Sequence, residues 1–411
     1  MKKYSRRNFF GKLMVLPAGL WMSNFNALCG SSSASKQVKI TAIKAIQLDF
    51  EHDGCLLKIE TDAGLVGYGE TGVTSNIARA FLQGRNMLIG ADPLSIGTHF
   101  FNMTAPVHPL FAPMALISGI DIALWDLAGK ILDQPVYKLL GGPFRKGCPM
   151  YSHGSYLKDM LDPVSCRSWA DYIKQHSEGF TSFKLGPPFR IQMPFHPTIT
   201  SDELKALSQG FANLRDAVGD SVEIGLHCHN EFDTYSAVAM ANTCKPYNIV
   251  FIEDPLSSPF SDGWVKLKEG TGVPVLTGEK LLTVREFKTF LDAKAVDIIH
   301  PDISFAGGFT GCMKIADYAA LTRTPVALHN VGTIIRTYAS AHLSMAIQNF
   351  YKSESSLGEP GRGELAEQMT PTEPPVIKNG ILQVPDRPGL GLLLDDDFLK
   401  KHLIKDEPWW G

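Results

Sequence analysis

The sequence predicts an α/β protein in which a closed barrel of parallel strands follows a small α+β domain. Two patterns predict the barrel. Short apolar runs alternate with helical patterns over about residues 149–354, and a polar residue stands at the end of successive runs at a nearly constant interval. A third pattern, two strands joined by a turn and followed by helices, predicts the smaller domain nearer the N-terminus.

The composition is that of an ordinary soluble globular protein. Apolar residues make up 44% of the 411 residues and charged residues 20%, which allows a substantial buried core. A formal net charge of −3 gives no reason to expect nucleic acid or an anionic membrane surface as a partner. The seven cysteines form neither a disulfide framework nor a Cys-based zinc site, so we expect mostly reduced core residues.

Residues 1–35 are predicted to be an export signal and linker. The segment begins with basic residues, continues with an apolar stretch too short to span a bilayer, and ends in small polar residues. The adjacent Arg6 and Arg7 indicate a twin-arginine signal, which would export the folded protein to the periplasm. Cleavage is expected after Ala34. The alternative, lipidation of Cys29, would leave the protein attached to a membrane.

Residues 36–145 are predicted to form the α+β domain. The stretch VKITAIKAIQLDF alternates apolar and polar residues, and GCLLKIETDAGLVGYGET contains a glycine turn at Asp62–Gly64. Helical patterns follow and stop at Gly141–Gly142. The C-terminal segment, residues 371–411, is too short for a domain of its own, and we expect it to pack back on this first domain.

Residues 146–370 are predicted to form the barrel. Strands that alternate with helices indicate a parallel sheet, and this many units favour closure into a TIM-type barrel. The predicted strands are FTSFKL, VEIGLH, NIVFIEDP, PVLTGEK, AVDIIHPD, TPVALHN and NFYKSES. Polar residues near the ends of six of them follow one another at steps of 26, 26, 23, 27 and 25 residues: His227, Glu253, Glu279, Asp302, His329 and Glu354. Eight βα units in ~250 residues average ~31 residues each, so these side chains are expected at the active-site end of the barrel.

Two pairs within this series indicate chemistry. Glu253 and Glu279 end neighbouring strands and offer the oxygen ligands that a hard divalent cation prefers, although solvated strand-end charges would look the same. Asp302 precedes His329 by one strand. A carboxylate that holds one imidazole nitrogen fixes the tautomer and leaves the other nitrogen to accept a proton, which makes His329 a candidate general base.

The order of motifs resembles the enolase superfamily, mandelate racemase subgroup. The motifs are GLVGYGET, DIALWDLAGKILDQPVYKLLGG, FKLG, IEDPL, TGEKL, HPDISFAGGFTG, ALHNVG and PGLGLLLDD, and the similarity covers nearly all of residues 38–398. The resemblance implies a modified (β/α)₇β barrel with an N-terminal capping domain that the C-terminal segment completes. It also implies a magnesium ion and removal of the proton next to a substrate carboxylate.

The resemblance assigns further roles. Lys184 matches a lysine that places positive charge beside the substrate carboxylate, and Glu354 matches a glutamate that hydrogen-bonds the enediolate. Gly186 stands where racemases carry a second lysine, so two-sided proton exchange is not expected. His229 matches the general acid of galactonate dehydratase-like members, which protonates the departing 3-hydroxyl. Together these residues predict dehydration of an aldonate or aldarate to a 2-keto-3-deoxy acid.

His227 departs from the family pattern, which has an aspartate as the third metal ligand at this position. In an extended strand His227 and His229 point the same way, and Cys228 points into the core. Imidazole suits Mn²⁺ or another transition metal better than Mg²⁺. His227 therefore either binds a softer metal, leaves Mg²⁺ with two carboxylates and additional water, or marks a member whose activity has changed.

Other interpretations and partners stay open at this stage. The nearest alternative is a racemase or epimerase of the same subgroup, and a more distant one is a non-catalytic periplasmic sugar-acid binder. Lys184 and three further residues are candidates for contact with substrate: His52, His153 and Tyr151. The resemblance also implies a homo-oligomer.

Overall fold

The computed structural model describes residues 37–51, 54–84, 88–104, 113–189, 198–229 and 232–411. The predicted export signal, with Cys29, and the candidate residue His52 lie outside these residues. Within the described part of the chain, no helix combines the length and the apolar character that crossing a membrane requires.

The capping domain is built on a three-stranded antiparallel sheet of order β1-β2-β3. Its helices follow the sheet in sequence. The elements are β1 (Ile40–Ile46), β2 (Cys55–Thr61), β3 (Val66–Thr71), α3 (Ser75–Gly84), α4 (Ile96–Thr104), α5 (Met114–Ile131) and α6 (Val136–Leu139). The predicted glycine turn joins β2 to β3, where Gly64 has a φ of +75° that a side chain would disfavour.

Helix α5 packs directly on β3, and two glycines of the strand make this possible. A Cβ atom at Gly67 would lie 2.2 Å from the carbonyl oxygen of Ala123, and one at Gly69 would lie 2.1 Å from that of Gly119. Both distances are far shorter than a van der Waals contact, so only glycine fits. The helix is apolar on most sides because it also packs on the barrel, where Trp125 Nε1 donates to Thr310 Oγ1 at 3.0 Å.

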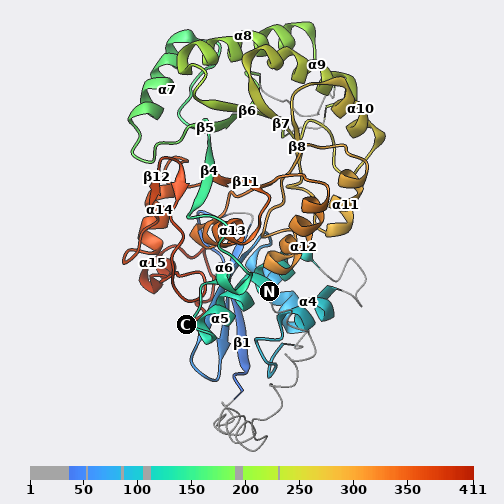
Figure 1. Cartoon of the computed structure of the whole chain (residues 1–411). Helices are drawn as coiled ribbons and strands as arrows, with labels where there is room; N and C mark the ends of the chain where they lie inside the picture. Colours follow the sequence, from blue (N-terminus) through green and yellow to red (C-terminus); the bar gives the residue numbers. More distant parts are fainter. Residues whose placement is uncertain (1–36, 52–53, 85–87, 105–112, 190–197, 230–231) are drawn as a thin grey trace, which may run out of the picture. The chain divides into compact units, whose positions relative to one another are not determined.

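The barrel consists of eight parallel strands, and β11 pairs with β4 to close it (Figure 1). Within the described residues, seven helices alternate with these strands on the outside. The strands are β4 (Cys148–His153), β5 (Ser182–Leu185), β6 (Glu223–His227), β7 (Ile249–Glu253), β8 (Val275–Thr277), β9 (Ile298–Ile299), β10 (Val326–Leu328) and β11 (Phe350–Ser355). The helices are α7 (Pro163–Gln175), α8 (Ser201–Val218), α9 (Thr234–Cys244), α10 (Asp262–Gly270), α11 (Val284–Asp292), α12 (Gly308–Leu321) and α13 (Ile334–Ala346).

The predicted fold class, a modified TIM barrel with an α+β cap, is confirmed. All seven predicted runs contain a strand, whereas β4 was not singled out because Pro149 interrupts its short apolar pattern. The main core lies between the strands and the outer helices, with Trp169, Trp264 and Phe309 among its large buried side chains. The six described cysteines are free and buried, as expected.

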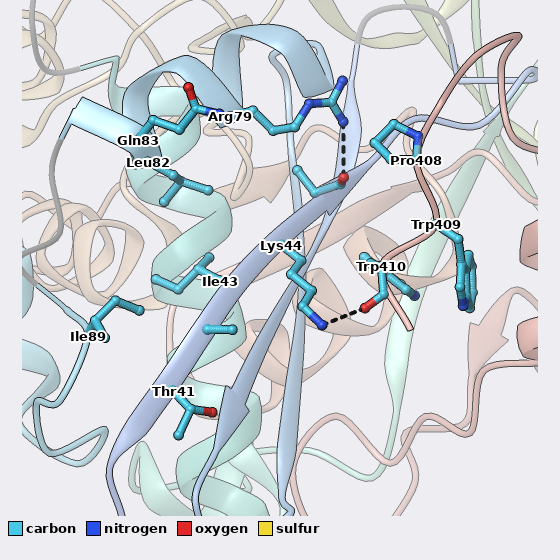
Figure 2. A pocket seen from close by; sticks show the side chains of 12 residues that line it. Thr41, Ile43, Lys44, Arg79, Leu82, Gln83, Ile89, Pro408, Trp409 and Trp410 are labelled. Carbon is cyan, nitrogen blue, oxygen red and sulfur yellow. Dashed lines mark hydrogen bonds between the residues drawn. The ribbon is translucent and has the colours of Figure 1, made fainter.

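The C-terminal segment contacts both the barrel and the cap. After α14 (Arg362–Met369), the short strands β12 (Ile377–Lys378) and β13 (Ile381–Leu382) form a hairpin, and β13 pairs with β4. Helix α15 (Asp396–Lys401) follows, and Leu403 then bridges to Leu48 beside β1. Lys44 Nζ of β1 donates to the carbonyl oxygen of Trp410 at 2.9 Å, beside an open hollow of about 630 Å³ (Figure 2).

Glu407 ties this segment to the cap. Its side chain is 3% exposed and accepts hydrogen bonds from Arg79 Nη1 at 2.7 Å, Ser75 Oγ at 3.0 Å and the backbone N–H of Gln47 at 3.0 Å. Burial alone would raise the pKa of this carboxyl, but the hydrogen bonds from Arg79 and Ser75 lower it below its usual value. Glu407 is therefore an ionised group that three partners of the cap hold in place.

We expect Glu407→Ala to lower the free energy of unfolding by about 2–3 kcal/mol, because hydrogen bonds to a charged group are lost and their donors are left unpaired. Urea unfolding followed by circular dichroism measures the change. The control is Asp397→Ala, since the Asp397 side chain is 96% exposed and lies 3.4 Å from Lys400; its effect should stay within about 0.5 kcal/mol. Equal effects of the two variants would contradict the structural role of Glu407.

Candidate active site

The register of the parallel strands gathers polar side chains at one end of the barrel. His227 at the end of β6 lies opposite Glu253 at the end of β7. Lys184 in β5 lies opposite His153 in β4. Paired residues of neighbouring parallel strands point to the same side of the sheet, so residues far apart in sequence converge at the carboxyl ends of the strands, where barrels of this type carry their active sites.

A cavity of about 360 Å³ lies at this end, between the barrel and the cap. Its lining includes six of the residues predicted for the site: His153, Lys184, His227, His229, Glu279 and His329. The lining residues that had not been predicted are Phe50, Glu51, Gly72, Phe305, Val331, Arg336, Glu359 and Arg362. Phe50, Glu51 and Gly72 belong to the cap, so both domains shape the cavity.

The other predicted residues lie behind this lining. Glu253, Asp302 and Glu354 are fully buried, and each contacts a residue that reaches the cavity. Tyr151 is also fully buried, and its hydroxyl lies 2.8 Å from His300 Nε2. Tyr151 is therefore placed to orient a neighbouring side chain rather than to face the cavity.

Lys184 is held between two carboxylates. Its Nζ lies 2.8 Å from Glu253 Oε1 and 2.9 Å from Glu354 Oε1. Burial alone would lower the pKa of Lys184, but the charges of both carboxylates raise it above its usual value. Burial would raise the pKa values of Glu253 and Glu354, but the charge of Lys184 helps to lower both well below their usual range. All three groups are therefore ionised.

Glu253 has one occupied and one free oxygen. Oε1 accepts from Lys184 and lies 2.8 Å from His227 Nδ1, whereas Oε2 is buried and has no hydrogen-bond partner within the described residues. Buried carboxylate oxygens are almost always paired. An unpaired oxygen of this kind matches the chemistry of a ligand for a hard cation.

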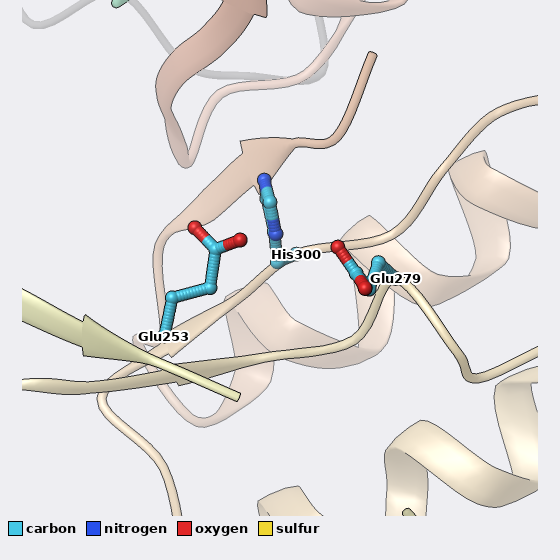
Figure 3. Close-up of side chains that lie close together, drawn as sticks. All are labelled: Glu253, Glu279 and His300. Atoms are coloured by element: carbon cyan, nitrogen blue, oxygen red, sulfur yellow. The ribbon is translucent and has the colours of Figure 1, made fainter. Parts of the chain in front are cut away.

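Glu253 belongs to a group of three side chains that are spaced as the ligands of a metal ion are. One donor atom each from Glu253, Glu279 and His300 lies within 4.8 Å of the others (Figure 3). Burial lowers the pKa of His300 to about 4, so its imidazole is neutral and can act as a ligand. These residues fit a divalent cation. His300 had not been predicted, although it lies two residues before Asp302 and, in an extended chain, on the same side.

The predicted imidazole–carboxylate pair is formed. His329 Nδ1–H donates to Asp302 Oδ2 at 2.6 Å, and Nε2 lies 3.3 Å from Glu279 Oε2 and 3.8 Å from Glu354 Oε2. Burial opposes the charged form, but the charge of Glu354 and the hydrogen bond to Asp302 raise the pKa of His329 to about 9. His329 is a strongly basic imidazole whose Nε2 faces the cavity.

His227 and His229 point the same way from the end of β6. Their ring centroids are 5.3 Å apart, and Cys228 between them is fully buried. His229 is the most accessible of the group, with 65% of its side chain exposed, and its Nε2 lies 3.7 Å from Glu279 Oε1. Partial loss of solvent around the ring, together with the nearby positive charges of Lys280 and Lys184, lowers the pKa of His229 below its usual value.

The sequence matches two family models that together span most of the chain. Residues 41–141 match the mandelate racemase/muconate lactonizing enzyme N-terminal domain, and residues 169–398 match the enolase C-terminal domain-like family. The chain belongs to the mandelate racemase/muconate lactonizing enzyme family of the enolase superfamily.

Relatives and solved structures of this family resemble the chain over nearly its whole length. It is 30% identical to D-xylonate dehydratase of Haloferax volcanii, with 90% of each chain covered. It is 31% identical to D-galactonate dehydratase of Ralstonia pickettii, with 86% of this chain and 92% of the relative covered. The mandelate racemase/muconate lactonizing enzyme-like protein of Rubrobacter xylanophilus superposes with a TM-score of 0.80 at 27% identity, over 92% of this chain and 100% of that one.

In this member of the enolase superfamily, the pair of His329 and Asp302 is also connected to the cap. Arg336 of α13 is buried, with Nη1 3.5 Å from Asp302 Oδ2 and Nε 3.0 Å from Glu70 Oε1. Glu70 of β3 also accepts from the backbone N–H of Thr333 at 3.0 Å. The motif GLVGYGET contains Glu70, but no sequence pattern indicated that Glu70, Arg336 and Asp302 contact one another. These residues come from three separate segments.

We expect Asp302→Asn to lower the pKa of His329 by about 1–3 units, because a negative charge in direct contact is lost. Titration of the metal-free protein with ¹⁵N-labelled histidine, followed by NMR and assigned with His329→Asn, measures the shift. Asp317→Asn on the exposed face of α12 is the control and should leave this pKa unchanged. An unchanged pKa in Asp302→Asn would show that Asp302 does not control the basicity of His329.

Proposed function

We propose that the protein is a lyase that dehydrates a sugar acid, an aldonate or aldarate, to a 2-keto-3-deoxy acid. The observation that carries this proposal is the position of His329 Nε2 in the cavity, with its other nitrogen bonded to Asp302 and the free Glu253 oxygen nearby. The dehydratases of xylonate, gluconate and galactonate to which the chain is similar support it.

The first step is removal of the proton next to the substrate carboxylate. This carbon is a very weak acid because loss of its proton places a second negative charge on the same group. Glu253 and Glu279 would hold a divalent cation, Mg²⁺ by family resemblance or Mn²⁺ because imidazoles are close, whose charge offsets the one that develops. Lys184 adds a fixed positive charge at the cavity wall, and its burial strengthens this effect.

His329 is the proposed base. Because Nδ1 donates its hydrogen to Asp302, the lone pair of the neutral ring is on Nε2, which faces the cavity. Without the cation, the pKa of about 9 makes this nitrogen a strong base that is mostly protonated at pH 7, and the positive charge of a bound cation would lower this pKa. Arg336 and Ser304 each contact Asp302, so the orientation of the pair is fixed from behind.

His229 is the proposed acid for the departing 3-hydroxyl. It lines the same cavity as His329 and is accessible enough to meet a substrate that extends toward the opening. Its lowered pKa means that the protonated form is scarce at pH 7.

The competing functions differ in what they require of the site. A racemase or epimerase needs a second base opposite His329, and position 186, two residues beyond Lys184, is glycine and offers no side chain for that role. A non-catalytic binder would use Lys184 and the cation for a carboxylate but would have no need of the His329–Asp302 pair. The pair therefore favours catalysis.

Two further proposals concern the setting of this reaction. We propose that the twin-arginine pattern at Arg6 and Arg7 exports the folded protein to the periplasm, and that the protein works there as a homo-oligomer, as the family resemblance implies. Export in the folded state would allow the cation to be inserted before the protein crosses the membrane.

We expect His329→Asn to reduce dehydration by a factor of about 10²–10⁴ and to abolish exchange of the α proton with solvent deuterium. His229→Asn should retain exchange and lose dehydration, because the proton can still leave but the hydroxyl cannot. A semicarbazide assay for 2-keto acid and proton NMR in D₂O measure the two steps on an aldonate and aldarate library.

Asn242→Asp on the exposed face of α9 is the control for these variants, and it should retain both steps. Normal dehydration by both histidine variants would overturn the assigned roles. Exchange into both epimers without keto acid would indicate a racemase. Tight binding of a sugar acid without exchange or keto acid would indicate a binder.

We expect removal of divalent cations with EDTA to abolish dehydration, because Glu253, Glu279 and the substrate carboxylate would then repel one another. Added Mn²⁺ or Mg²⁺ should restore it in proportion to the amount bound, measured by plasma emission spectroscopy. Full activity in protein shown to contain less than a few per cent of bound metal would contradict the cation's role.

A further inference from the structure

His300 is a fully buried histidine that the proposed mechanism leaves without a role. It follows β9, and its Nε2 lies 2.8 Å from Tyr151 Oη. Its Nδ1 is buried and has no hydrogen-bond partner in the part of the chain that the structure describes. Leaving a buried polar atom unpaired is energetically costly, which points to a partner other than the described residues.

Neither tautomer of the neutral ring satisfies both nitrogens of His300. If Nδ1 carries the hydrogen, that N–H has no acceptor. If Nε2 carries it, Nε2–H donates to Tyr151 Oη, and the lone pair of Nδ1 then faces no donor. A cation at Nδ1 completes the second arrangement. Histidines that bind metals commonly donate their other N–H to such an orienting group.

The neighbours of His300 are suited to the same cation. Glu253 Oε2 is likewise buried and unpaired, and one donor atom each from Glu253, Glu279 and His300 lies within 4.8 Å of the others. Ligands at 2.0–2.2 Å from one ion are at most about 4.4 Å apart, so small side-chain movements close the site. Figure 3 shows the His300 side chain between the two carboxylates.

We propose that His300 Nδ1 is the third protein ligand of the divalent cation, beside Glu253 and Glu279, and that Tyr151 orients the ring. The inference rests on the proposed function only in that a cation binds these carboxylates. His227 then has a different role, because its Nδ1 is turned to Glu253 Oε1 and so helps to aim Glu253 Oε2 at the ion. A nitrogen ligand favours Mn²⁺ and other transition metals over Mg²⁺.

The test uses Mn²⁺ alone, without substrate, on full-length protein stripped with EDTA. Pulsed electron paramagnetic resonance detects the coupling of a bound imidazole ¹⁴N to Mn²⁺, and the signal of free Mn²⁺ gives the Kd. We expect a nitrogen coupling in the wild type. His300→Leu should lose it and raise the Kd at least 10-fold. The matched variant His227→Leu should keep the coupling.

A second variant keeps the test decisive if His300→Leu fails to fold. Tyr151→Phe leaves the ligand in place but removes its orienting partner, so we expect the coupling to persist with a Kd raised about 10–100-fold. The proposal is overturned if the wild type shows no coupling, if His227→Leu loses it, or if a folded His300→Leu keeps it. This test does not depend on turnover. A protein that binds Mn²⁺ through nitrogen but dehydrates no sugar acid would therefore overturn the proposed function and leave the assignment of His300 intact.

Discussion

The ion pairs of Lys184 with Glu253 and Glu354 are the interaction on which the site depends. Two carboxylates buried in one barrel would repel each other, and at least one would take up a proton. The buried ammonium group between them keeps both ionised and holds one oxygen of each. The second oxygen of Glu253 is therefore free in a direction that the protein has fixed, and this pre-organised charge is what a cation site requires.

The barrel supplies the precision of this arrangement. Each functional side chain stands at or just beyond the end of a short strand, and the parallel register places His227 beside Glu253 and Asp302 beside His329. Side chains that are 26 and 27 residues apart in sequence thus meet within hydrogen-bonding distance. The outer helices and the large core hold the strand ends rigidly, so the site itself can contain groups that are costly to bury.

The sequence predicted most of this framework because its signals are local or periodic. The apolar runs predicted seven strands, and the spacing of Glu253, Glu279 and His329 predicted which side chains converge. His300 was missed because its role depends on what surrounds it: a histidine at a strand end is common, and only the three-dimensional structure shows that one nitrogen is unpaired. The burial of Tyr151 could not be predicted either. Successive side chains of a strand point alternately toward and away from a cavity, and the sequence does not show on which side Tyr151 lies.

The ion pair of Glu70 with Arg336 has a consequence for how such enzymes acquire new substrates. Glu70 comes from the cap, yet through Arg336 it supports the carboxylate of Asp302, which holds the imidazole of His329. A chimera that joins this barrel to a foreign cap would leave a buried guanidinium without its counter-ion unless the incoming cap carried an acid at the same place. Diversification is then easier at Phe50, which reaches the cavity from the segment between β1 and β2, than at Glu51, whose carboxylate interacts electrostatically with both Glu70 and Arg336.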